Sequence, residues 1–462
     1  MNVCSIKDCG RPTHKESEYC IFHAKPEEKT EKEFKKALEK YIKKIKENNL
    51  DYNFIRFIFI GDIDFERDFK VTTFKNANFE YSTLGGSIFF INLAFKGITV
   101  FSNVTFEGEI KFWSITFETK VEFRRVVFKK DAEFIGIIFK GLTDFRDVTF
   151  ERNIDFERVT FKEDAKFDDS TFQRNLSFKY ANLSPVKKLN LRAKKKGILS
   201  FEYASLENVY LNLYLNKGTL IDFTNSLLRN TKIERGQIEN HILQEDKEEF
   251  SQAREIYLLL KNNFHSIGRY DDESWAYIKE RDMEKMSKSF YSLLNKYKKH
   301  SLFKKIFKEG NLLKRVIIKL KIFRKWLFSK KAIEWFNLSV SDFIFQYGEN
   351  PWRVIRFAFI IIFLFAIILN FSGIVNSDRT NLIIEIIKEN QGDGYTIRYL
   401  GPVLGSFLNC LYFSVVTFTT LGYGDFQPAV GLSRFFVSLE SIIGAITMAL
   451  FVYTYARRTG GR

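Results

Sequence analysis

A strict phenylalanine period constrains the fold of this chain more than any other feature of its sequence. One series repeats at every eleventh residue, and a second series follows each member of the first by five residues. The first series is Phe79, Phe90, Phe101, Phe112, Phe123, Phe134, Phe145, Phe156, Phe167 and Phe178, and the second is Leu84, Phe95, Phe106, Phe117, Phe128, Phe139, Phe150, Phe161, Phe172 and Leu183. A helix does not repeat cleanly at steps of five and six, whereas stacked short strands do. We therefore predict a solenoid whose coils hold about 22 residues and rise by about 4.8 Å, with each phenylalanine resting on one from the coil below.

The repeat extends beyond the strict series at both ends. Phe65, Phe69 and Phe74 indicate an earlier start. After a basic loop around Lys194 to Lys196, the pattern resumes at Phe201, Leu206 and Leu211. The pattern resembles the pentapeptide-repeat family, although a sixth residue in alternate units departs from it. This resemblance implies a right-handed, quadrilateral β-solenoid, which we assign to residues 51–235.

The surface charge of the repeat region bears on its partners. Some pentapeptide-repeat proteins mimic DNA with a strongly acidic surface, but residues 61–183 hold 20 acidic and 18 basic residues. We therefore expect neither DNA mimicry nor nucleic-acid binding. Because each repeat contacts only its neighbours, the solenoid suits a rigid spacer, an assembly surface or the binding site of a cytoplasmic regulator.

The cysteines define a candidate metal site at the N-terminus. Of four cysteines in 462 residues, three lie in the first twenty, spaced as Cys4-x4-Cys9-x10-Cys20-x2-His23. Three thiolates and an imidazole suit tetrahedral Zn2+, and so short a segment needs a staple to fold. The string resembles short Cys3His zinc knots, so we predict a structural zinc site in residues 1–25. Unligated, reduced cysteines are the alternative, and His14 is a rival ligand.

Two long apolar segments near the C-terminus predict membrane helices. They run from Val354 to Val375 and from Val430 to Tyr455, and each is long enough to cross a hydrocarbon core of about 30 Å. Between them, Leu404 to Leu421 is apolar and ends in glycines, which favours a re-entrant helix and loop. The alternative is three buried helices of a soluble core.

The basic residues predict the orientation of these spans. Residues 296–331 hold fourteen Lys or Arg and one acid, and the chain ends with three arginines in its last six residues. By the positive-inside rule we expect both termini in the cytoplasm, the 376–403 loop outside, and a two-pass protein of the cell membrane. No secretory signal opens the chain.

The segments between these domains read as helical. Residues 26–50 predict a charged helical spacer, and residues 236–300 predict a helical hairpin that turns at Gly268. Residues 301–349 form a basic amphipathic juxtamembrane segment. Its 301–331 part interleaves Lys and Arg with large apolar residues, which suits anionic lipid better than nucleic acid. Trp335 and Trp352 are expected as interfacial anchors.

The sequence Ser414 to Pro428, SVVTFTTLGYGDFQP, carries the chemistry of the chain. A pore that strips water from K+ must replace it with a ladder of oxygens, and backbone carbonyls supply them if left- and right-handed residues alternate. Gly422 and Gly424 allow that alternation at little cost. Thr420 adds a hydroxyl oxygen, and the negative end of the preceding helix favours a cation.

The string Thr419 to Asp425 resembles the selectivity filter of potassium channels, and the resemblance covers residues 350–458. It implies that the carbonyls of Thr420, Leu421, Gly422 and Tyr423 coordinate K+, that Gly424 forms the outer mouth, and that Thr419 and Asp425 support the filter. Leu421 replaces the commoner valine. Four copies around one axis imply a homotetramer.

The second span carries the remaining candidate residues. Gly444 resembles a hinge glycine, with close helix packing as the alternative. Ala445, Met448 and Val452 share one helical face with it and are expected to line the cavity. Glu440, an ionisable group inside a span, is expected to hydrogen-bond the helix before the filter.

Together these features predict a multidomain protein: an α-helical membrane pore module, a cytoplasmic β-solenoid and a helical linker. The expected function is a potassium-selective channel, with a less selective cation channel and a membrane-tethered scaffold as rivals. No nucleophile–base pair or phosphate loop stands out, so we do not expect an enzyme.

Overall fold

The phenylalanine period folds into four parallel sheets that form the faces of a β-solenoid of about eight turns. The computed structural model describes residues 3–299, 312–376, 400–429 and 431–459. The chain divides into two compact units, Met1–Ser287 and Lys288–Arg462. The predicted fold class, a solenoid with a helical linker and C-terminal helices, is confirmed.

The strands are short, and each sheet collects every fourth one. One sheet holds β1 (Tyr52–Asn53), β5 (Ala77–Asn78), β9 (Thr99–Val100), β13 (Val121–Glu122), β17 (Thr143–Asp144) and β21 (Ala165–Lys166). A second holds β2 (Ile58–Phe59), β6 (Thr83–Leu84), β10 (Thr105–Phe106), β14 (Val127–Phe128), β18 (Thr149–Phe150), β22 (Thr171–Phe172), β24 (Lys188–Ala193) and β26 (Tyr210–Tyr214). A third holds β3 (Ile63–Asp64), β7 (Ile88–Ile91), β11 (Ile110–Trp113), β15 (Ala132–Ile135), β19 (Ile154–Asp155), β23 (Leu176–Ser177), β25 (Ile198–Ser200) and β27 (Leu220–Asp222). The fourth holds β4 (Thr73–Phe74), β8 (Ala94–Phe95), β12 (Thr116–Phe117), β16 (Ile138–Phe139) and β20 (Thr160–Phe161).

The phenylalanine ladder forms the core of the solenoid. Phe112 pairs in register with Phe134, 22 residues later, and their rings stack at 4.8 Å. Within a coil the rings meet edge to face, as do Phe112 and Phe123 at 86°. Such aromatic pairs contribute about 0.5–1.5 kcal/mol beyond their burial. The predicted coil of 22 residues is therefore confirmed.

The corners of the coils require left-handed backbone that the sequence does not announce. One residue with positive φ lies two positions after each phenylalanine of the first series. These residues are Tyr81, Asn92, Asn103, Ser114, Arg125, Gly136, Asp147, Arg158, Asp169 and Tyr180. Only one of the ten is glycine, although this conformation costs other residues about 1–2 kcal/mol. The stacked core holds the backbone in place against that cost.

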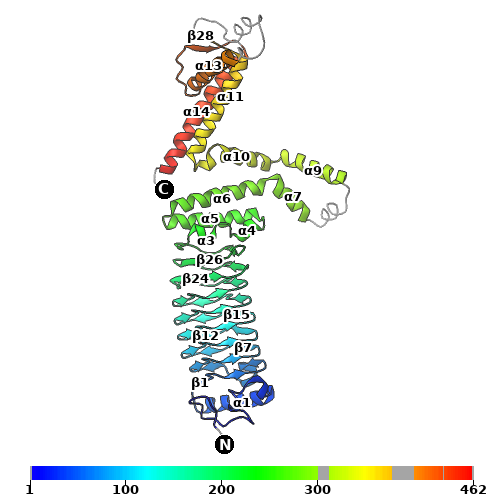
Figure 1. Cartoon of the computed structure of the whole chain (residues 1–462), viewed down its shortest axis with the longest axis vertical. Coiled ribbons are helices and arrows are strands. Elements are labelled where there is room, and N and C mark those ends of the chain that lie inside the picture. Colours follow the sequence, from blue (N-terminus) through cyan, green and yellow to red (C-terminus); the bar gives the residue numbers. More distant parts are fainter. Residues whose placement is uncertain (1–2, 300–311, 377–399, 430, 460–462) are drawn as a thin grey trace. The chain divides into compact units, whose positions relative to one another are not determined.

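Helices close both ends of the solenoid (Figure 1). At the first coil, η1 (Pro26–Glu28) precedes α1 (Glu31–Glu47), which buries Phe34, Leu38 and Ile42 against the core. The apolar face of α1 is thus a cap, which differs from the solvated spacer expected for residues 26–50. Within the first coil, the short helix α2 (Phe65–Phe69) lengthens the register from 22 to 25 residues.

The other end is covered by the helical linker. It contains α3 (Arg235–Ile238), α4 (Leu243–Asp246), α5 (Phe250–Ser266) and α6 (Tyr270–Lys288). Asn263 of α5 binds both backbone groups of Thr231, accepting from its N–H at 2.9 Å and donating to its carbonyl at 2.8 Å. Gly268, with a φ of +70°, lies between α5 and α6, at the predicted turn. The open strand edges of the last coil are therefore paired or covered.

The second unit contains the apolar helices. It runs through α7 (Phe290–Lys299), α9 (Leu312–Leu327), α10 (Lys330–Phe345), η2 (Gln346–Gly348), α11 (Pro351–Ser372), β28 (Ile374–Asn376), α13 (Leu400–Phe418), β29 (Phe426–Pro428) and α14 (Leu432–Thr459). Helices α11 and α14 lie side by side (Figure 1), and α13 packs on both. The first span begins three residues earlier than predicted because Pro351 occupies its first turn and Asn350 caps it. Residues 374–376 form β28, which pairs with β29.

An ion pair joins the end of α14 to the segment that precedes α11. Arg457 contacts the buried Glu349 carboxylate at 3.0 Å, and Arg458 donates to the Glu349 carbonyl at 3.1 Å. The backbone of Gln346, Tyr347 and Gly348 has positive φ throughout, which folds η2 back against α14.

Candidate functional site

The three N-terminal cysteines and His23 come together in one cluster. Their ligand atoms all lie within 4.8 Å of one another. His23 Nδ1 is 3.4 Å from the Sγ atoms of both Cys4 and Cys20, and Cys9 Sγ is 3.7 Å from Cys20 Sγ. His14, the rival ligand, lies instead beside Glu33 at 3.9 Å.

The orientation of the imidazole suits a metal ligand. His23 Nε2 lies 3.2 Å from the carbonyl oxygen of Ile55, so it donates its proton there. That leaves the Nδ1 lone pair directed at the sulfur atoms, as metal-ligating histidines require. Three sulfurs and one nitrogen are the donor set of structural zinc sites, so the residues fit a metal such as zinc.

A buried lysine beside this cluster was missed by sequence reasoning. Lys29 donates to the carbonyls of Ile21, at 3.0 Å, and Ile58, at 2.6 Å, and burial lowers the pKa of its ammonium to about 8. It ties the knot to the first coil. A lysine in a charged stretch reads as solvated, so no sequence signal marks it.

The candidate filter begins directly after α13. Thr420, Gly422 and Gly424 have φ values of 57°, 58° and 83°, so every second residue of this segment is left-handed. Thr420, Leu421, Gly422, Tyr423, Gly424 and Asp425 are all exposed in the single chain. Leu421 is 59% and Tyr423 is 68% exposed, although both are large and apolar. Such exposure indicates a surface that other parts of an assembly cover.

The C-terminal part of the chain has a recognisable family. Residues 393–459, which include α13, the candidate filter and α14, match the model described as ion channel. This part of the chain is an ion-channel domain. Residues 134–182 match the model described as pentapeptide repeats, with nine copies. Comparison with curated proteins and with solved structures gave no match.

The ion-channel domain contains two helices long and apolar enough to cross a membrane. They are α11, with 22 residues, and α14, with 28. Together with the family match they identify a membrane protein. Ion-channel domains generally assemble as oligomers in a bilayer, and neither matched family is enzymatic in general.

A polar contact buried between three helices supports the segment before the filter. Ser414 of α13 and Glu440 of α14 are both fully buried, and the Ser414 hydroxyl contacts Glu440 Oε1 and the Ile362 carbonyl, the latter at 2.9 Å. A hydroxyl has one hydrogen, so both contacts are hydrogen bonds only when the Glu440 carboxyl is protonated and donates to Ser414. The expected contact between Glu440 and this helix is present.

Asp425 lies on the outer side of the same helix. The side chain of Tyr412, on α13, hydrogen-bonds the Asp425 carboxylate, and its ring packs on Phe426 at 6.1 Å. Thr419 turns inward instead, because its hydroxyl donates to the Val415 carbonyl at 2.7 Å. Asp425 is therefore placed to brace the filter, while Thr419 closes the end of α13.

Gly444 lies at a close approach between α14 and the end of α13. A Cβ built on it would overlap the Phe418 carbonyl oxygen and lie 2.9 Å from the Phe418 carbonyl carbon. The packing alternative thus has direct support, while the hinge role is untested. Ala445, Met448 and Val452 are exposed on α14.

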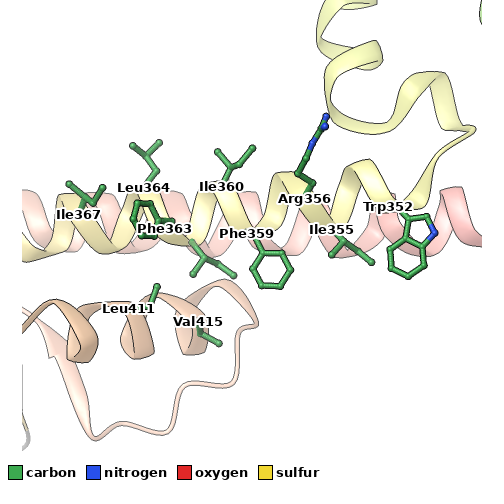
Figure 2. Close-up of a pocket in the computed structure, with 11 residues that line it drawn as sticks. Trp352, Ile355, Arg356, Phe359, Ile360, Phe363, Leu364, Ile367, Leu411 and Val415 are labelled. Atoms are coloured by element: carbon green, nitrogen blue, oxygen red, sulfur yellow. The ribbon is translucent and has the colours of Figure 1, made fainter. Parts of the chain in front are cut away.

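A large apolar groove runs along α11 and α13. Its volume is about 940 Å3, and Figure 2 shows the side chains of α11, including Phe359 and Phe363, beside Leu411 and Val415. Arg356 is the only charged residue among those that line it. An open apolar surface of this size requires lipid or another subunit to cover it.

Proposed function

We propose that the chain is the subunit of a homotetrameric, potassium-selective channel. In this proposal the carbonyls of Thr420, Leu421, Gly422 and Tyr423 coordinate K+, and Gly424 forms the outer mouth. The observation that carries it is the alternation of left-handed residues along Thr419–Asp425, a string that follows the C-terminal end of α13 in an ion-channel domain. Alternating backbone handedness directs successive carbonyls toward one axis, where they replace the hydration shell of the ion.

The tetramer follows from what one chain lacks. One copy supplies only one wall of an oxygen ladder, and its Leu421 and Tyr423 side chains are exposed. Met448 and Val452, which are 52% and 63% exposed, would line the cavity below the filter together with Ala445. Four copies would cover these surfaces and close the ring of carbonyls.

We place both termini in the cytoplasm of a two-pass protein of the cell membrane. The basic residues that precede α11 and follow α14 support this orientation. Residues 377–399, most of the expected outer loop, lie outside the described residues.

The juxtamembrane helices support binding to anionic lipid. In α9, Val316, Leu320, Phe323 and Leu327 are exposed at helical spacing, and Lys319, Lys321 and Arg324 are exposed beside them. A basic helix with an apolar stripe lies flat on an anionic membrane surface. Residues 300–311 of the predicted 301–331 segment lie outside the described residues.

We assign the N-terminal cluster to structural Zn2+, held by Cys4, Cys9, Cys20 and His23. Four protein ligands leave no open position for catalysis. When bound, the metal would fasten the knot against the first coil, where Phe22 stacks on Phe57 at 4.5 Å. The zinc knot and solenoid would then assemble or regulate the pore.

The test is the reversal potential of purified protein in planar bilayers under opposed K+ and Na+ gradients. We expect a value close to the K+ equilibrium potential. Gly422→Asp should abolish the current, because an L-residue strains the positive φ and the carboxylate occupies the axis. Gly236→Asp is the matched control, since Gly236 has open space and ordinary φ in the solenoid unit.

The rival functions give different results. A reversal potential near zero, with Gly236→Asp behaving like the wild type, would replace the proposal with a less selective cation channel. If both proteins assemble in the bilayer and neither conducts under any stimulus, the membrane-tethered scaffold is the better description.

A further inference from the structure

One edge of the solenoid carries a row of like charges. Lys130, Arg152, Arg174 and Lys196 follow one another at intervals of 22 residues, which is one per coil. All four side chains are exposed and line one cavity of about 510 Å3. The other lining residues are Glu109, Asp131, Asn153 and Asn175.

Stacking makes these charges close neighbours. The coils are about 5 Å apart here, as the Phe134 and Phe156 rings show at 4.9 Å. Like charges in register on neighbouring strands are destabilising. Elsewhere on this solenoid, residues 22 apart form opposite pairs: Lys140 with Glu118 at 2.7 Å and Lys129 with Glu107 at 2.8 Å. The four-cation row therefore departs from the pattern of its own fold.

The cations of the row have no internal counterion. Among the described residues, none of the four makes an ion pair within 4.0 Å or a side-chain hydrogen bond. The two acids of the cavity, Glu109 and Asp131, lie in the coils at one end of the row.

The neutral side chains of the cavity leave donors rather than acceptors. Asn175 Oδ1 accepts from the Ile198 N–H at 2.9 Å, and Asn153 Oδ1 accepts from the Asn175 N–H at 3.4 Å. With those oxygens engaged, the amide nitrogens remain as donors. Asp131 also spends one oxygen on the Asn153 N–H, at 3.0 Å.

We infer that this cavity binds a small anion with two or more phosphate groups, of the nucleoside polyphosphate class. Arginine forks match phosphate oxygens, and charge-assisted bonds of this kind are strong. The cavity is within the size range of small-molecule sites. A nucleic-acid strand fits less well, because no aromatic side chain lines the cavity to stack on bases and the acids repel a continuing backbone. This site is independent of the proposed potassium selectivity.

The experiment is calorimetric titration of the purified full chain with ATP and, separately, with inorganic tripolyphosphate. The test variant is Arg152→Ala with Arg174→Ala. The matched control is Lys140→Ala with Lys162→Ala, which removes two charges from another edge. We expect binding in the wild type and control, and a loss of about 100-fold in the test variant, since each charge-assisted bond contributes roughly tenfold.

The two probes separate the sources of the phosphate chemistry. Tighter binding of ATP assigns the site to a nucleotide, whereas equal binding assigns it to a phosphate chain alone. The inference is overturned if neither probe binds at millimolar concentration in low salt, or if test and control variants weaken binding equally. Displacement of ATP by single-stranded RNA with higher affinity would overturn it in favour of a nucleic-acid surface.

Discussion

Gly444→Ala distinguishes the two roles that this glycine can have in the channel domain. The added Cβ would lie 2.9 Å from the Phe418 carbonyl carbon and 3.0 Å from its Cα, where ordinary contacts begin at 3.4 Å. Since those atoms are backbone, α14 must withdraw from α13 by about 0.5 Å or more, and overpacking of this kind costs about 1–3 kcal/mol. Alanine returns up to about 1 kcal/mol of helix propensity, so we expect a net loss of about 1–2 kcal/mol per subunit.

The assay is the fraction of assembled oligomer that survives heating in detergent, followed by size-exclusion chromatography, with open probability measured in bilayers. Gly405→Ala is the control, because Gly405 is a helical glycine of α13 whose added Cβ meets open space. We expect the control to match or exceed the wild type. A Gly444→Ala oligomer as heat-stable as the wild type, with only its open probability altered, would refute the packing argument and favour a hinge.

Three further predictions test other parts of the molecule. Phe145→Ala should lower the free energy of unfolding of the solenoid by about 3–5 kcal/mol, because its fully buried ring stacks on both neighbouring coils; a thermal melt followed by circular dichroism checks this, and a shift below one degree would contradict it. Arg457→Gln should leave the Glu349 carboxylate buried without its cation, at a cost of about 3 kcal/mol, and should change single-channel open probability; unchanged gating and stability would mean that the ion pair is dispensable. A chelator or His23→Gln should remove bound zinc, measured by mass spectrometry, and increase hydrogen exchange in the first coil; retention of zinc by the variant would exclude His23 as a ligand.

The parts of the fold that repeat were readable from the sequence, whereas their ends were not. The eleven-residue period predicted the coil length and the stacking of Phe112 on Phe134, because each coil solves the same packing problem as the last. It did not predict that α1 caps the first coil. That outcome depends on burying Phe34 and Leu38 against an exposed edge, which is a contact between distant segments.

The candidate sites divide in the same way. The spacing of Cys4, Cys9, Cys20 and His23 announced a metal cluster, but the Ile55 carbonyl that fixes the imidazole comes from the first coil. The bond between Ser414 and Glu440 depends on how α13 and α14 pack, although an acid inside a span already marked Glu440.

The sequence by itself determined the domain types, because period, apolar length and glycine spacing are local properties of the chain. The tertiary structure alone decided which side chains meet across it. It placed Gly444 against the backbone of Phe418, and it aligned Lys130, Arg152 and Arg174 along one edge. A residue interval of 22 has meaning only once the coil has closed, since only then do those charges become neighbours about 5 Å apart.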